Sequence, residues 1–121
     1  MRYVVLLRGD PILGAGGGAA FLEAMHAYED DLGKAGVKLA SEALGSSRTS
    51  THIRFDSDGV RSIRSGTPDE AGEVLAAFLL IQVRSNEEAI EWARRCPLDR
   101  ALADGDEADI EVREVVDEPP W

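Results

Sequence analysis

The sequence predicts an α+β fold in which an antiparallel sheet carries two helices on one face. Patterns typical of strands and helices follow one another along the 121 residues in the order strand, helix, strand, hairpin, strand, helix, strand. Residues 2–8 and 74–83 are apolar on both faces, as expected of two central, neighbouring strands. Two strand–helix–strand halves of this size favour a ferredoxin-like sandwich with an inserted β-hairpin.

The first half of the chain supplies a strand, a helix and a second strand. Residues 2–8 form the first strand. Residues 19–35 predict a helix, because apolar residues recur there at every third or fourth position. His26 points away from this apolar stripe and is expected on the surface. Residues 37–44 then alternate in polarity and predict the next strand.

A β-hairpin is expected between the two halves. Residues 49–55 alternate clearly, with His52 and Arg54 on the same side of the strand. The dipeptide Asp58-Gly59 is typical of a hairpin turn. Residues 60–64 form the returning strand.

The second half repeats the order of the first. Residues 74–83 predict a strand. Ser85 is a predicted N-cap, and Glu88 stands where a capping box places its acidic residue. Pro97 ends the helix that follows, and residues 109–116 predict the last strand.

Composition narrows the class of protein. Thirteen basic and twenty-three acidic residues give a formal net charge of -10, which argues against a nucleic-acid partner. One cysteine cannot form an internal disulfide. The apolar run Tyr3–Leu7 is too short for a signal peptide or a membrane span. We therefore expect a single cytoplasmic domain over residues 1–121, with an acidic, proline-rich tail at 117–121 and no membrane partner.

The glycine-rich residues 14–19 match the dinucleotide-binding pattern G-x-G-x-x-A only formally. They begin six residues after the strand ends, so a flexible linker is the better interpretation. The two histidines, His26 and His52, and the one cysteine have no metal-ligand spacing. No cofactor and no metal are expected.

The predicted sheet leaves one face without helices. Val, Leu and Phe side chains of the two central strands would lie on that face, and soluble monomers rarely expose such a patch. A second copy, packed sheet against sheet with two-fold symmetry, would cover it and form a dimeric α/β barrel. The alternative is a monomer in which the hairpin, residues 49–64, folds over the open face.

His52 and Arg54 are the candidate functional pair. If their side of the strand faces the barrel interior, Arg54 can hold an anionic group and His52 can move a proton near neutral pH. Glu42, on a neighbouring strand, can join them. The alternative is that both side chains line the solvated face of an edge hairpin.

Several segments, taken together, resemble the YCII-related, DGPF-domain proteins over residues 1–116. The segments that carry the likeness are Tyr3–Asp10, Lys34–Val37, Ser41–Leu44, Thr49–Arg54, Asp58-Gly59, Phe78–Ile81 and Asn86–Ala93. This resemblance implies a ferredoxin-like dimeric barrel. It also implies a mostly unassigned function, with some relatives thought to be small enzymes that use a His–Asp pair and others accessory proteins of sigma factors.

The resemblance transfers residue by residue only in part. Gly9 and Asp10 match the Gly-Asp that follows the first strand of the family, and Glu42 matches the acid of its second strand. The Asp-Gly-Pro-Phe motif falls on residues 65–68, where Ser65 replaces the aspartate. We therefore do not transfer a His–Asp mechanism.

These observations predict a homodimer that binds a small organic molecule, such as an organic anion, in the barrel cleft. The candidate ligand-binding residues are Arg54, Glu42, Arg8 and Ser65. An alternative is a cofactor-independent lyase, isomerase or monooxygenase that uses His52 with Asp10 or Glu42 as catalytic residues. A second alternative is an accessory module that binds another protein.

Overall fold

The computed structural model describes residues 1–9, 18–66 and 74–121. Its main sheet has four antiparallel strands in the order β2-β5-β1-β6, which is the ferredoxin-like order. The predicted α+β fold is therefore confirmed, with β1 and β5 as the central pair. The four strands are β1 (Arg2–Arg8), β2 (Lys38–Ala43), β5 (Leu75–Gln82) and β6 (Asp109–Glu114).

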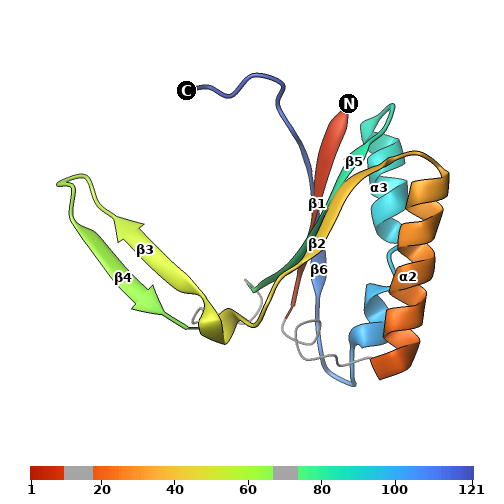
Figure 1. Cartoon of the computed structure of the whole chain (residues 1–121), viewed down its shortest axis with the longest axis horizontal. Coiled ribbons are helices and arrows are strands. Elements are labelled where there is room, and N and C mark those ends of the chain that lie inside the picture. The colour runs from red at the N-terminus through yellow and green to blue at the C-terminus, as the bar shows by residue number, and fades with distance from the viewer. Residues whose placement is uncertain (10–17, 67–73) are drawn as a thin grey trace.

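Two helices cover one face of this sheet (Figure 1). They are α2 (Gly18–Lys34) and α3 (Asn86–Arg94). The Ser85 hydroxyl accepts a hydrogen bond of 3.1 Å from the backbone N–H of Glu88, as the predicted N-cap requires. The Glu88 carboxylate reaches one residue further back than a standard capping box and accepts from the N–H of Arg84 at 2.9 Å.

The core lies between the sheet and these helices. Val5 and Leu7 of β1 and Ile81 of β5 are almost completely buried, together with Leu32 of α2. Tyr28 of α2 is also buried, and its hydroxyl donates a hydrogen bond of 2.7 Å to the carbonyl oxygen of Trp92. This bond satisfies the one polar group that the ring brings into the core and ties α2 to α3.

Gly9 shows why the first strand must end in glycine. Its backbone has φ of 146°, and its N–H donates to the carbonyl oxygen of Val74 at 3.0 Å. A Cβ atom at this position would lie 3.0 Å from the Cβ of Ala108. Only glycine has both the required backbone conformation and the required absence of a side chain.

Over residues 1–9, 18–66 and 74–121, the opposite face of the sheet carries no helix. Cross-strand pairing places Val4 beside Leu80 and Leu6 beside Phe78 on this helix-free face. All four side chains are partly exposed, whereas the alternating residues of β1 are buried under the helices. The expected apolar surface is therefore present, and barrel closure by a second copy stays a prediction.

The predicted hairpin stands apart from the main sheet. A short 3-10 turn, η1 (Ser47–Thr49), leads into β3 (Thr51–Phe55), which pairs with β4 (Arg61–Ser65) in a separate two-stranded sheet. We call β3–β4 the hairpin arm. It projects from the helix-free side of the molecule (Figure 1) and is largely exposed. The alternative in which this hairpin folds over its own sheet is therefore not what the structure contains.

Candidate functional site

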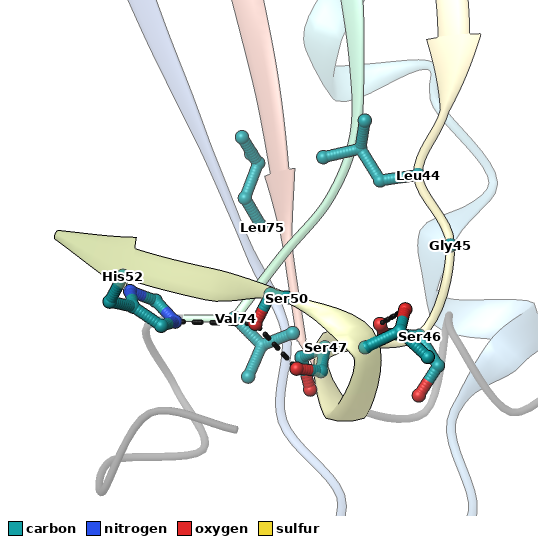
Figure 2. A pocket seen from close by; sticks show the side chains of 9 residues that line it. Leu44, Gly45, Ser46, Ser47, Ser50, His52, Val74 and Leu75 are labelled. Carbon is teal, nitrogen blue, oxygen red and sulfur yellow. Dashed lines mark hydrogen bonds between the residues drawn. The ribbon is translucent and has the colours of Figure 1, made fainter. Parts of the chain in front are cut away.

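A cavity of about 410 Å³ lies where the hairpin arm joins the sheet. Leu44, Val74 and Leu75 form its apolar side, while η1 and the first turn of the arm supply hydroxyl groups and the His52 ring (Figure 2). We call this the arm-base cavity. It is lined by Leu44, Gly45, Ser46, Ser47, Thr49, Ser50, His52, Val74 and Leu75.

Local hydrogen bonds fix the walls of the arm-base cavity. Just beyond β2, the N–H of Leu44 donates to the carbonyl oxygen of Ala76 at 2.8 Å. Ser46 then caps η1, because its hydroxyl accepts from the N–H of Arg48 at 3.2 Å. At the other end of the arm, the N–H of Gly66 donates to the carbonyl oxygen of Ser50 at 3.0 Å. This last bond closes the base of the hairpin arm beside η1.

The hydroxyl of Ser50 orients the His52 ring. Its Oγ lies 3.2 Å from Nε2 of His52 and 3.1 Å from the carbonyl oxygen of Gly66, and it also contacts the carbonyl oxygen of Ser47 (Figure 2). A hydroxyl has one proton, and carbonyl oxygens only accept. With two backbone acceptors in reach, we assign the Ser50 proton to the backbone, and in this tautomer Nε2 of His52 donates to Ser50. This leaves Nδ1 as the ring nitrogen available to a ligand.

A second hollow, of about 280 Å³, continues from His52 along the same face of the arm. His52 and Arg54 of β3 line it with Ser62 and Arg64 of β4. The structure thus brings the predicted pair together on one face. Arg54 has no ion-pair partner among residues 1–9, 18–66 and 74–121, so its guanidinium is available to an anion.

The other predicted site residues lie elsewhere. Ser65 pairs with Thr51 and so lies on the face of the arm opposite His52. Arg8 forms a 2.6 Å ion pair with Glu111, while Glu42 lies beside Phe78 on the helix-free face. Arg8 and Glu42 are separated by β5, which places their strands roughly 10 Å apart. Asp10 lies outside the described residues.

Sequence reasoning missed the hydroxyl-bearing residues of the cavity. Four of them fall in the five-residue segment Ser46–Ser50, which we assigned partly to a strand and partly to a connection. A dense run of serine and threonine between two strands signals side chains that hydrogen-bond the backbone and form turns. That signal could have identified η1, although not the cavity beside it.

Two further searches cover only the described part of the chain. No three histidine, cysteine or acidic side chains gather there in a way that could hold a metal ion. Neither α2 nor α3, nor any other helix in that part, has the length and apolar character needed to cross a membrane.

Comparison with known proteins gives the family. A search of curated proteins found no significant match. The sequence profile of the YCII-related domain, however, matches residues 1–117, which is nearly the whole chain. The match includes all the strands and helices described above, the hairpin arm among them. The chain therefore belongs to the YCII-related domain family.

Proposed function

We propose that this protein binds a small organic anion at the base of the hairpin arm and works as a two-fold homodimer. The observation that carries the proposal is the arm-base cavity, whose volume is in the range of small-molecule sites. Its apolar side would hold a carbon skeleton. Nδ1 of His52 would accept a hydrogen bond from the ligand, and Arg54 in the adjoining hollow would neutralise its charge.

The homodimer is supported by the helix-free face. Val4, Leu6, Phe78 and Leu80 form a continuous apolar surface across the two central strands. A second copy related by a two-fold axis would bury the same surface on both chains. The proposal places the protein in the cytoplasm, where a lone cysteine such as Cys96 stays reduced.

Catalysis by His52 is the competing proposal, and the local geometry favours binding over it. In His–Asp pairs a carboxylate holds the histidine, and its charge stabilises the imidazolium that forms. Here the partner of the ring is the hydroxyl of Ser50, which orients His52 but carries no charge. Ser50 is therefore a positioning residue and not a nucleophile.

A thermal-shift screen of small carboxylates and phosphates tests the proposal. A compound present at a hundredfold excess over its Kd stabilises the folded protein by about 2.7 kcal/mol. We expect such compounds to shift the melting temperature of the wild type and to lose most of that shift in Arg54→Gln. Arg84→Gln is the matched control, because Arg84 is an exposed arginine remote from the cavity.

The outcomes separate binding from catalysis. Binding that persists in Arg84→Gln and falls at least tenfold in Arg54→Gln and in His52→Ala supports the proposal. Equal stabilisation of the wild type and Arg54→Gln would remove Arg54 from the site. Chemical conversion of a hit compound by the wild type, but not by His52→Ala, would instead establish an enzyme.

A further inference from the structure

The hairpin arm presents an apolar face that nothing in the described part of its own chain covers. Ile53 and Ile63 are paired across the two strands, and Phe55 lies two residues along on the same face. Their relative exposures are 53% for Ile53, 62% for Phe55 and 73% for Ile63. The Arg61 guanidinium lies over the Phe55 ring at 5.1 Å and shields only part of it. Three large apolar side chains gathered on so small an element mark an interaction surface.

The charge of the arm indicates the kind of partner. Residues 51–65 hold three arginines and two aspartates, whereas the rest of the chain holds ten basic and twenty-one acidic residues. The arm is thus a cationic element on a strongly acidic protein. Such an element is attracted to the body of another copy of the same chain.

The position of the arm agrees with this charge pattern. It projects on the helix-free side of the sheet (Figure 1), which is the side on which the proposed second copy would lie. A copy packed on Val4, Leu6, Phe78 and Leu80 would therefore lie on the same side of the sheet as the arm.

We infer that the hairpin arm is a dimer clasp, whose Ile53, Phe55 and Ile63 side chains are buried against the second copy. This inference rests on the homodimer proposed above. It also gives dimerisation a role in binding, because the arm carries His52 and Arg54. The second copy would hold the arm in place and so fix one wall of each ligand site.

Sedimentation equilibrium on a triple variant tests the clasp. Ile53→Thr, Phe55→Thr and Ile63→Thr remove the apolar surface while keeping residues that favour strands. The wild type is expected at twice the chain mass of 13.1 kDa. Because six apolar side chains would be lost per dimer, the triple variant should dimerise with a Kd at least roughly a hundredfold weaker. Leu22→Gln on α2 is the matched control, since Leu22 is 52% exposed and should leave the Kd unchanged.

A labelling experiment tests whether the apolar face of the arm is buried in the dimer, while leaving Ile53 and Phe55 unchanged. In a Cys96→Ala background, the thiol of Ile63→Cys should react with a maleimide at least tenfold more slowly at dimer concentrations than after dilution to monomer. The thiol of Leu22→Cys should react equally fast in both states.

Each result decides between the two proposals. A wild-type dimer whose triple variant dimerises equally well, with Ile63→Cys unprotected, overturns the clasp and leaves the homodimer standing. A wild type that stays monomeric at every concentration overturns both. The comparison of the wild type with Arg54→Gln in the ligand screen tests the cavity separately, because neither protein alters the apolar face of the arm.

Discussion

Burial of the Cys96 thiol makes the stability of the fold depend on pH above about 9. Cys96 is buried beside Met25, whose sulfur lies 3.9 Å from its own. Desolvation disfavours the thiolate and raises the pKa of Cys96 from 9.0 to about 12. The pKa of this thiol is therefore higher in the folded protein than in the unfolded chain. Its protonation stabilises the fold fully below pH 9, and this stabilisation is lost as the pH rises toward 12.

The magnitude follows from the two pKa values. Between pH 8 and pH 10 the unfolded thiol ionises almost completely while the buried thiol stays protonated, which lowers the free energy of unfolding by about 1.4 kcal/mol. Urea unfolding followed by circular dichroism at both pH values measures this loss. Cys96→Ala keeps every other titrating group, so the wild type should lose about 1.4 kcal/mol more than the variant.

An equal pH-dependent loss in the wild type and in Cys96→Ala would refute this reasoning. It would mean that Cys96 ionises in the folded protein as easily as in the unfolded chain. Alkylation by iodoacetamide gives an independent check, because a thiol protonated at pH 9 should react only as fast as the protein unfolds.

Two further substitutions probe the strand end and the cavity. Gly9→Ala should cost about 2 kcal/mol or more in urea unfolding, because it adds both backbone strain and a clash with Ala108. Gly33→Ala, in an open position on α2, should instead stabilise the protein by up to about 1 kcal/mol, and equal effects would contradict the strain argument. Ser50→Ala should raise the share of His52 with its proton on Nδ1, as read from the nitrogen chemical shifts of the ring. An unchanged tautomer would show that Ser50 does not orient the ring.

Most of the fold could be predicted because its elements have strong local signals. The double-sided apolar pattern of residues 2–8 and 74–83 can be satisfied only by central strands, and β1 and β5 are indeed neighbours. Ser85 caps α3 as expected, because an N-cap depends on four consecutive residues and not on the rest of the fold. Such signals are independent of tertiary context.

The position of the hairpin could not be predicted in the same way. Alternation in residues 49–55 indicates a strand with two faces, but it does not say what each face meets. The same pattern suits an arm that projects and a hairpin that covers the sheet. The choice depends on the direction that the chain takes through η1, and the Ser/Thr run that signals a turn there does not encode that direction.

The candidate site could be predicted only where it follows strand alternation. His52 and Arg54 share a face because they are two residues apart on β3. The cavity itself also needs Leu44 and Leu75, which come from two other parts of the chain. Arg8 and Glu42 were grouped with the pair although β5 separates their strands, because distance across a sheet is not encoded in any one segment.

The different polarity of the two faces of the arm indicates that one face makes a protein contact and the other binds the ligand. A hairpin that served only as a solvated loop would need no isoleucine or phenylalanine, and one that served only as a hydrophobic contact would need no row of arginines. Here the alternation of β3 and β4 places Ile53 and Ile63 on one face and Arg54 and Arg64 on the other. Arg61 is the arginine on the apolar face, where it lies over the Phe55 ring. Because both faces belong to one rigid pair of strands, burial of the apolar face against a second copy would reduce the motion of the cationic face. Ligand affinity should therefore fall in the Ile53→Thr, Phe55→Thr, Ile63→Thr variant, although none of these side chains lines the cavity.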